Sequence, residues 1–590
     1  MKLKKILALV LALALVCTAF AACGGDTTSS TTSSTPSSST GTDSSTTSSE
    51  VSTGTDEPSG DATALFQAKS VDDAKNINLN AGMEPTGLNT IKATYSIEFA
   101  MFKHLYDNLL MLDENDQPQP SAAESFEVSE DNTVYTFKLR QDGKWTNGDT
   151  VTANDFAFAW QQVLTPDAGS DYAYFLYVIK NGEKYFNGEC DWEEVGVKVI
   201  DDYTLEVTLD HAIPYAEFLF TFGTFAPINQ RFYEAVGADS YSTEAEYFCT
   251  NGAYAVTEWT HDSQVVMQKN DAYRGAADIE VEQITWKIIK DPNAAMTEFL
   301  AGGLDMVNAT TGELVKQATD SGFEISSYND GGAFYIYFNH KNEYLSNANL
   351  RQALALAFDK EALVNTVFQN GNVPMTAFTN PAVHAYDGKT SFVEAAQEAN
   401  GGELTPKNGD VEKAKEYLAT ALTELNCTVE DLSAALSVDC GDSSVAQAEA
   451  AFYQNQWSKN LGINVTINPM ITKQGSQNRK DGNYVMSLTG WGPDYDDPMT
   501  FLDLWVSDSG NNQTFYASEE YDKLIDDATL ETDFEKRQGI FYDLEKMVVN
   551  DLPVAPSWWR NPSYAMSDKI KGGMLRSTFQ DINAINVKLS

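Results

Sequence analysis

Short segments that alternate between apolar and polar residues are separated by turn residues along much of the chain. Residues 133–140 (TVYTFKLR) place Tyr135, Phe137 and Leu139 on one face, which predicts a half-buried strand. Residues 205–209 (LEVTL) and 463–467 (INVTI) also have strand patterns. These segments predict a protein that contains sheets throughout its length.

Apolar residues recur at helical spacing in three other places. The first stripe begins at Phe156, and Thr152 with Asp155 before it resembles a capping box in which Asp replaces Glu. The second stripe covers residues 347–368 and the third covers residues 411–422. Helices that alternate with strands predict an α/β or mixed class. No period of 20–50 residues repeats, which argues against a solenoid or a propeller.

The first 22 residues have the layout of a secretory signal peptide. Three lysines within the first five residues precede an apolar run over residues 6–22 that ends in small side chains. The run of about 17 residues is at the short limit for a membrane-spanning helix, so an uncleaved signal anchor is the alternative. A cleaved signal peptide over residues 1–22 is the prediction.

Cys23 follows that run in the stretch FAACG, which resembles a bacterial lipobox with Phe20 in place of the usual Leu. Cys17 is a second candidate. Residues 23–63 are mostly Ser, Thr, Gly, Asp and Pro, a composition that buries too little apolar surface to offset its ordering entropy. We therefore predict a lipidated Cys23 followed by a disordered tether.

Charge and length restrict the class of the remaining chain. About 530 residues follow the tether, more than one hydrophobic core usually supports, so several lobes are expected. The formal charge of −46 opposes binding to nucleic acids and to anionic lipid surfaces. A solvated acidic surface is our interpretation, and an acidic cleft that attracts cationic ligands is the alternative.

Catalytic and redox motifs are missing from the sequence. Gly388-Lys389-Thr390 ends like a P-loop, but Val383 stands where the motif needs a glycine. No G-x-S-x-G or H-E-x-x-H motif occurs, and the five histidines are widely separated. The four later cysteines form no C-x-x-C pair, and a Cys427–Cys440 disulfide or free thiols both fit. A binding protein without a cofactor or a metal is the prediction, rather than an enzyme.

An acidic stretch over residues 489–503 is the strongest candidate for ligand chemistry. Counted from Asp494, an EF-hand would need Gly at Met499 and Glu at Trp505, so only a looser calcium site stays open as an alternative. The segment GWGPDY places the Asp494 carboxylate beside aromatic residues and glycines, which let a ligand approach closely. It is either an ordinary rigid loop or a site that pairs with an ammonium group.

Seven blocks of the chain resemble the oligopeptide-binding proteins of ABC importers, within the peptide and nickel family of solute-binding proteins. Together they extend over nearly the whole chain after residue 80. The blocks are Glu84-Pro85 with Leu88-Asn89, residues 144–156 (KWTNGDTVTANDF), residues 196–209 (GVKVIDDYTLEVTL), residues 251–254 (NGAY), Phe338-Asn339, residues 351–354 (RQAL), and Gly490-Trp491 with Asp494-Tyr495.

The resemblance implies an α/β fold of the periplasmic-binding-protein kind (type II, cluster C): a two-lobed clamshell with an additional third domain. Hinge closure would enclose the ligand. The expected first lobe comprises residues 64–106, 236–290 and 548–590, the extra domain residues 107–235, and the second lobe residues 291–547.

The resemblance also implies roles for individual residues. Asp494 would bind the amino terminus of a peptide, with Tyr172 near the same amine. Exposed strand edges would pair with the peptide backbone, which gives affinity without reading side chains. These edges are Thr94, Tyr95 and Ser96, together with Gly490, Trp491 and Gly492; further pocket candidates are Asn251, Arg479, Trp558 and Trp559.

Two positions depart from the pattern of some relatives. Leu488 stands where they have an Arg that helps to hold the carboxylate of a short peptide, and Thr472 stands where they have a pocket Trp. Longer peptides or another carboxylate anchor are therefore expected.

The resemblance also implies the partners and the location of the protein. The expected partners are an oligopeptide, the transmembrane subunits of an ABC permease, and the membrane, which the lipid would reach. The protein is expected to be a monomer on the extracellular side of the membrane, and the long tether favours a Gram-positive surface. A receptor for a dipeptide, nickel chelate, oligosaccharide or signalling peptide is the first alternative, and a tethered enzyme or adhesin is the second.

Metabolic labelling with a fatty acid tests the predicted anchor. We expect the wild-type chain to incorporate the label and the Cys23→Ala variant to lose it, because two acyl chains on this residue are sufficient for stable anchoring. Labelling that persists in Cys23→Ala would contradict the assignment.

Overall fold

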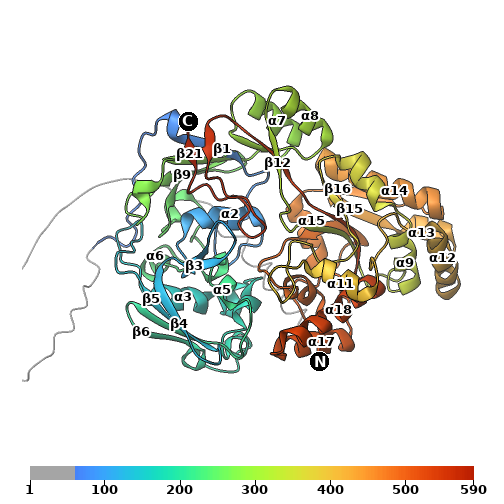
Figure 1. Ribbon diagram of the computed structural model, residues 1–590, viewed down its shortest axis with the longest axis horizontal. Coiled ribbons are helices and arrows are strands. Elements are labelled where there is room, and N and C mark those ends of the chain that lie inside the picture. The colour runs from blue at the N-terminus through green and yellow to red at the C-terminus, as the bar shows by residue number, and fades with distance from the viewer. Residues whose placement is uncertain (1–59) are drawn as a thin grey trace, which may run out of the picture. The chain divides into compact units, whose positions relative to one another are not determined.

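A computed structural model describes residues 60–590 of the chain (Figure 1). The predicted signal peptide, Cys23 and most of the predicted tether lie outside the described residues. Among the described residues, no helix combines the length and the apolar character that crossing a bilayer requires.

The N-terminal segment completes a sheet with residues that lie about 200 positions later. Strand β1 runs parallel to β10, and the other neighbouring strands of this sheet are antiparallel. Ile77 and Leu79 of β1 are fully buried because this strand adds to one side of the sheet and packs into the core. The order of strands is β1 (Asn76–Asn80), β10 (Gln283–Lys287), β9 (Gln264–Lys269) and β8 (Tyr254–Thr260).

A second four-stranded sheet lies within residues 123–208 and is antiparallel throughout. This sheet contains both strands predicted in the region. The strand predicted at residues 133–140 is confirmed as β5, and the strand predicted at residues 205–209 is confirmed as β7, which begins and ends one residue earlier. The predicted helix is confirmed as α3 (Ala153–Val163), where the Asp155 carboxylate accepts a 2.8 Å hydrogen bond from the Thr152 N–H. The order of strands is β4 (Ala123–Val128), β5 (Val134–Leu139), β7 (Thr204–Thr208) and β6 (Val197–Asp201).

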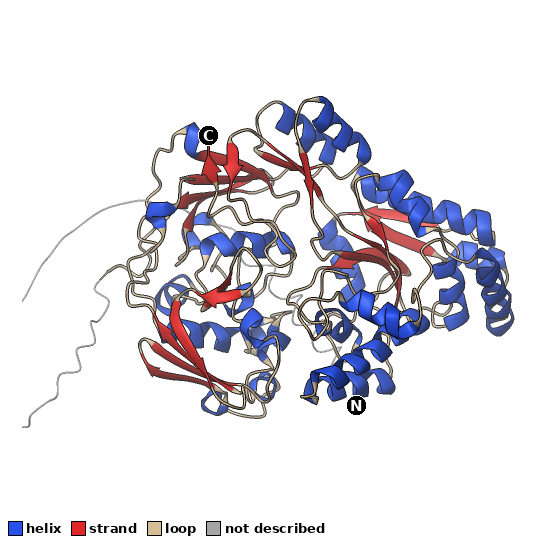
Figure 2. Cartoon of the chain, in the orientation of Figure 1, coloured by secondary structure: helices blue, strands red, loops and turns tan. Residues whose placement is uncertain are grey.

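The largest sheet has six strands and mixed directions. Helices α9, α14, α15 and α18 contact it, as Figure 2 shows for the helices around these strands. The domain bounds expected from the sequence stay a prediction. They assign β18 to the first lobe, but this strand is hydrogen-bonded between β13 and β14 of the largest sheet. The order of strands is β14 (Val373–Pro374), β18 (Val554–Trp559), β13 (Ala333–Phe338), β17 (Met486–Trp491), β15 (Ser437–Gly441) and β16 (Thr466–Met470).

Smaller sheets and helices complete the described chain. A three-stranded sheet orders β11 (Met306–Asn308), β19 (Ser563–Met566) and β12 (Ile325–Ser327), and two pairs join β2 (Leu110–Leu112) to β3 (Pro118–Pro120) and β20 (Ile570–Gly572) to β21 (Lys588–Leu589). The other helices are α2 (Ser96–Leu105), α4 (Gly182–Phe186), α5 (Ala216–Leu219), α6 (Gln230–Val236), α7 (Pro292–Leu300), α8 (Gly312–Asp320), α9 (Ala348–Leu356), α10 (Lys360–Leu363), α11 (Phe392–Asn400), α12 (Val411–Leu425), α13 (Val429–Ala435), α14 (Ser444–Leu461), α15 (Thr472–Lys480), α16 (Met499–Leu502), α17 (Glu519–Leu530) and α18 (Phe534–Asp551).

Two predicted elements differ from the structure, while the third predicted helix, residues 411–422, is confirmed as α12. The single helix over residues 347–368 is wrong, because α9 ends and α10 begins at a new N-cap, where the Asp359 side chain accepts a 2.8 Å hydrogen bond from the Ala362 N–H. The strand predicted at residues 463–467 begins only at Thr466, and its Pro469 is tolerated because β16 is an edge strand.

All four cysteines in the described chain are free thiols. Cys249 and Cys440 are buried, whereas Cys190 and Cys427 are half-buried. The Cys427–Cys440 disulfide that the sequence left open is therefore absent.

Candidate functional site

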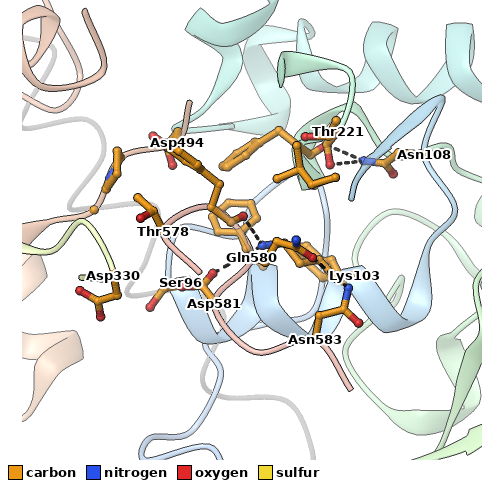
Figure 3. A pocket seen from close by; sticks show the side chains of 18 of the residues that line it. Ser96, Lys103, Asn108, Thr221, Asp330, Asp494, Thr578, Gln580, Asp581 and Asn583 are labelled. Carbon is orange, nitrogen blue, oxygen red and sulfur yellow. Dashed lines mark hydrogen bonds and ion pairs between the residues drawn. The ribbon is translucent and has the colours of Figure 1, made fainter. Parts of the chain in front are cut away.

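Two adjoining cavities contain most of the residues proposed for ligand binding. The first has a volume of about 300 Å³ and the second about 1010 Å³, and both are lined by Phe334 and Arg560. Figure 3 shows the first cavity, where residues from the start of α2, from the loop after β17 and from the C-terminal segment meet. It brings together eight predicted residues: Thr94, Tyr95, Ser96, Tyr172, Gly490, Trp491, Gly492 and Asp494.

Glu98 fixes the segment that carries Thr94 to Ser96. Its carboxylate is fully buried in the first turn of α2. One oxygen accepts hydrogen bonds from the Thr86 N–H (2.7 Å) and hydroxyl (2.8 Å), and the other from the N–H groups of Thr94 (2.9 Å) and Tyr95 (3.1 Å). This carboxylate therefore positions one wall of the first cavity.

Strand β17 presents an open backbone edge to the cavity. It pairs with β13 along its whole length but with β15 only through Met486 and Ser487. Residues 488–491 thus have no ladder partner on that side within the described chain. Gly490 is required here because a Cβ would lie only 2.8 Å from the Ala333 carbonyl oxygen.

Asp494 is an ionisable group without a counter-charge. Its Oδ2 atom is buried and has no hydrogen-bond partner in residues 60–590, while its N–H donates to the Thr500 hydroxyl at 3.0 Å. Burial raises the pKa of Asp494 well above its ordinary value, and the charges of Asp503 and Asp581 raise it further against a smaller opposing effect of Lys103. A cation that entered the cavity would relieve this cost.

The lysine nearest to this carboxylate in the cavity is committed elsewhere. Lys103 lies 3.8 Å from the Asp581 carboxylate and donates a 2.6 Å hydrogen bond to the Phe579 carbonyl (Figure 3). Burial lowers the pKa of Lys103. The pair ties α2 to the C-terminal segment, and the Asp494 Oδ2 atom is left without a hydrogen-bond partner among the described residues.

A second ion pair lies where the two cavities meet. The Arg560 Nε donates to Asp330 at 2.5 Å, and the guanidinium carbon lies 5.2 Å from the centre of the Phe334 ring, over its face. The sequence indicated none of Lys103, Asp581, Arg560 or Asp330, since each stands outside a recognisable motif and the site forms only when distant segments pack together.

The acidic residues after β17 turn to separate partners. Asp496 accepts hydrogen bonds from the His384 ring (2.7 Å) and N–H (2.8 Å), and Asp497 forms a bidentate pair with Arg537 at 2.5 and 3.0 Å. Across residues 60–590, no three His, Cys, Asp or Glu side chains gather into a group that could hold a metal ion. The looser calcium site is therefore not supported.

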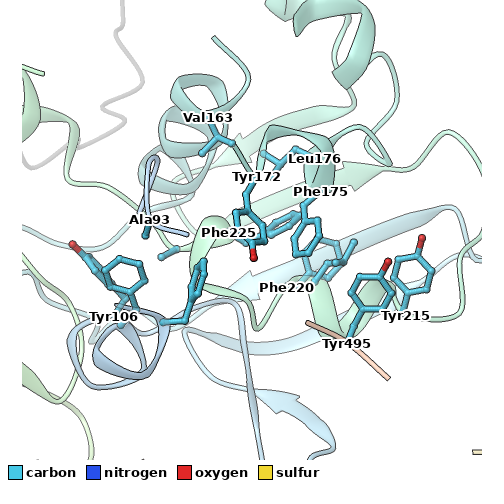
Figure 4. Packing of buried hydrophobic residues seen from close by; sticks show 14 of the residues in the cluster. Ala93, Tyr106, Val163, Tyr172, Phe175, Leu176, Tyr215, Phe220, Phe225 and Tyr495 are labelled. Carbon is cyan, nitrogen blue, oxygen red and sulfur yellow. The ribbon is translucent and has the colours of Figure 1, made fainter. Parts of the chain in front are cut away.

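Aromatic contacts join the loop after β17 to the region around α5. Tyr495 stacks on Tyr215 with ring centres 4.2 Å apart and planes 10° apart (Figure 4). The ring of the buried Tyr172 lies nearly parallel to that of Trp491, with ring centres 6.5 Å apart. Burial raises the pKa of Tyr172 well above its ordinary range, with the Asp494 charge next in importance. Tyr172 and Asp494 therefore face the same space.

The four further pocket candidates have different surroundings. Trp558 lines the second cavity. Asn251 is a structural residue whose amide makes hydrogen bonds of 3.0 and 2.9 Å with the Asp107 backbone, and Arg479 bonds to Gln513 at 3.1 Å. Trp559 is buried in the hydrophobic core. Asn251, Arg479 and Trp559 line neither cavity.

Comparisons with known proteins agree on one family. The model of the bacterial extracellular solute-binding proteins, family 5 (middle region), matches residues 117–513. The dipeptide-binding protein DppE of Bacillus subtilis is 30% identical over 501 residues, which cover 84% of this chain and 89% of DppE.

Solved structures extend the likeness to the fold. The substrate-binding domain of an oligopeptide ABC transporter from Bacillus anthracis matches with a TM-score of 0.81 and 31% identity over 88% of this chain and all of that one. The structure of Listeria monocytogenes OppA bound to peptide matches with a TM-score of 0.80 and 29% identity, again over 88% of this chain and all of that one. The α/β clamshell with an additional domain is thereby confirmed. The chain belongs to family 5 of the bacterial extracellular solute-binding proteins.

Proposed function

We propose that this chain captures oligopeptides between its two lobes and delivers them to the permease of an ABC importer. The observation that carries this proposal is the buried Asp494 carboxylate, which has no partner and faces a cavity beside an open strand edge. Names of similar proteins support it: one is an oligopeptide transporter's substrate-binding domain, and another is an OppA bound to peptide.

The amino end of the peptide would supply the missing positive charge. An ammonium group within reach of Asp494 forms a charge-assisted hydrogen bond that bulk water screens little once the lobes close. Tyr172 and Trp491 would form apolar walls around the first residue. Loss of either partner would leave the other charge buried, at a cost of roughly 3–5 kcal/mol.

The peptide backbone would pair with the open edge of β17, and the loop at residues 94–96, whose Thr94 and Tyr95 N–H groups already donate to Glu98, would form the facing wall. Residues 94–96 are held by Glu98, and residues 490–492 continue the open edge of β17. Backbone pairing reads no side chains, so it would supply affinity for many peptide sequences.

The size of the cavities favours peptides longer than two residues. The second cavity of about 1010 Å³ adjoins the first and reaches the upper end of volumes usual for small-molecule sites. The name of DppE favours a dipeptide instead, which the first cavity alone could hold. Mass spectrometry of small molecules that co-purify with the chain would distinguish a dipeptide, an oligopeptide, a nickel chelate and an oligosaccharide.

The proposal includes the setting of the protein. A lipid on Cys23 and the tether would hold a monomer at the extracellular side of the membrane, near the permease. The proposed lobes and extra domain keep the bounds expected from the sequence, except that β18 belongs with the sheet of the second lobe. A binding role without catalysis means that a peptide mixture would be returned intact, whereas a hydrolase would release products.

Asp494→Asn tests the proposed ammonium site. The amide keeps the shape of the side chain but removes its charge. We therefore expect the affinity for a hexapeptide with free ends to fall at least about a hundredfold, where each tenfold loss corresponds to roughly 1.4 kcal/mol of binding free energy. Isothermal titration calorimetry measures this. N-acetylation of the same peptide should weaken binding to the wild type in the same way, and unchanged affinity in either case would refute the assignment.

Glu98→Gln tests whether the wall at residues 94–96 takes part in binding. The carboxylate now accepts hydrogen bonds from backbone N–H groups, and the NH₂ group of glutamine would place a second donor against such a group. We therefore expect the free energy of unfolding to fall by about 1–3 kcal/mol and peptide binding to weaken. Chemical denaturation and calorimetry at a temperature where the variant stays folded measure both. Glu124→Gln, at an exposed position of β4, is the control. Full affinity in folded Glu98→Gln would contradict this role.

The raised pKa of Asp494 predicts a pH dependence of binding. In the empty site the carboxyl keeps its proton to a higher pH than an ordinary Asp, and only the ionised form pairs with an ammonium group. Peptide affinity should therefore fall as the pH falls through this raised pKa, and binding there should release a proton. Calorimetry in buffers of different ionisation enthalpy measures the release.

Asp503→Asn sharpens this test because the Asp503 charge is the largest charge effect on the pKa of Asp494. The variant should shift the acidic loss of affinity to lower pH, and Asp494→Asn should abolish the proton release. Affinity that does not change with pH in the wild type would contradict the linkage.

A further inference from the structure

One wall of the second cavity is a stack of aromatic rings. The rings of Phe334 and Trp558 are parallel within 2° at a centroid distance of 4.1 Å, and Phe368 lies 4.5 Å from Trp558 on a tilted plane. All three line the second cavity. The Arg560 guanidinium lies over the Phe334 ring, so this wall offers a guest mainly apolar ring surface.

Glu449 of α14 lies beside this wall and also lines the cavity. One oxygen of its carboxylate accepts hydrogen bonds from the Trp558 indole N–H at 2.8 Å and from the Tyr453 hydroxyl at 3.0 Å. These bonds fix the orientation of the half-buried side chain. The other oxygen accepts no hydrogen bond from any residue in the range 60–590.

Glu449 has no counter-charge in the described chain. No Lys, Arg or His of residues 60–590 forms an ion pair with it, and Arg560 at the border of the cavity is committed to Asp330. Burial raises the pKa of Glu449 to about 7, against the effect of its two hydrogen bonds. An apolar guest side chain would bury this carboxyl further without a partner, whereas a cationic one would compensate it.

We propose that Glu449 and the Trp558 wall form a side-chain pocket that selects a basic residue, Lys or Arg, of the bound peptide. The inference rests on the proposed function, because it requires a peptide that extends from Asp494 into the second cavity. The aliphatic stem of the basic residue would lie along the rings, and its ammonium or guanidinium group would donate to the open oxygen of Glu449.

Strand register places the pocket and the open edge of β17 on the same sheet. Phe334 of β13 pairs with Gly490 on one side and with Trp558 on the other. The peptide position whose side chain reaches Glu449 is the quantity that a scan of positions determines.

A peptide scan tests the pocket. Hexa-alanine with free ends is compared by calorimetry with peptides that carry one Lys, or one uncharged norleucine of similar length, at each of positions 2 to 6. At one position we expect the wild-type chain to bind the Lys peptide at least about tenfold more tightly than the norleucine peptide. The Glu449→Gln variant should lose this preference, because its amide oxygen can still accept from Trp558 and Tyr453 while the charge is gone.

Asp442→Asn is the matched control, since Asp442 is an exposed carboxylate that lines the same cavity and its change alters the net charge equally. It should keep the preference for Lys. The pocket is refuted if no position prefers Lys in the wild type, or if the preference survives in Glu449→Gln. Binding of hexa-alanine without any preference for Lys would refute the pocket alone, whereas failure of every peptide to bind the wild type would overturn the proposed function as well.

Discussion

A buried carboxylate without a partner is the constraint on which the site depends. Asp494 bears the cost of desolvation together with repulsion from Asp503 and Asp581, and Lys103 is engaged by the C-terminal segment. The surrounding loop resists relaxation because Asp497 is fixed by Arg537 and Tyr495 is stacked on Tyr215. The fold thus keeps an ionisable group in surroundings that disfavour its charge, at a place where a cationic guest would stabilise the ionised form.

The sheets explain how this charge reaches the cavity. Strand β17 is held on one side by β13 but loses its other neighbour after Ser487, so its last residues and the following loop project free backbone groups. The opposing segment is held by Glu98, whose two oxygens accept hydrogen bonds from Thr86 and from the N–H groups of Thr94 and Tyr95. A strand edge and a loop from distant parts of the sequence are thereby positioned around Asp494, which suits a ligand recognised mainly by its backbone and its charged end.

Local patterns in the sequence predicted the elements whose structure depends on neighbours in the chain. The strand at residues 133–140 and the helix that Asp155 caps are examples, since alternation and capping act over a few residues. The break between α9 and α10 was missed because the apolar stripe continues across it, while Asp359 starts a new helix. The free thiols and the separate partners of Asp496 and Asp497 likewise depend on tertiary packing.

The candidate site shows the same division. The resemblance in the GWGPDY segment led to Asp494, yet spacing could not reveal Lys103, Asp581 or Arg560, which packing brings to the cavities. Trp558 and Trp559 were equal candidates in the sequence. Successive side chains of a strand point to opposite faces, so Trp558 lines the second cavity whereas Trp559 is buried in the main core.

The location of the amino end of a bound peptide tests the central claim most directly. A crystal structure of the chain with a hexapeptide that has free ends would measure it. The account predicts that the peptide's ammonium nitrogen lies within about 3 Å of an Asp494 carboxylate oxygen. A peptide bound elsewhere, with Asp494 facing solvent, would contradict it.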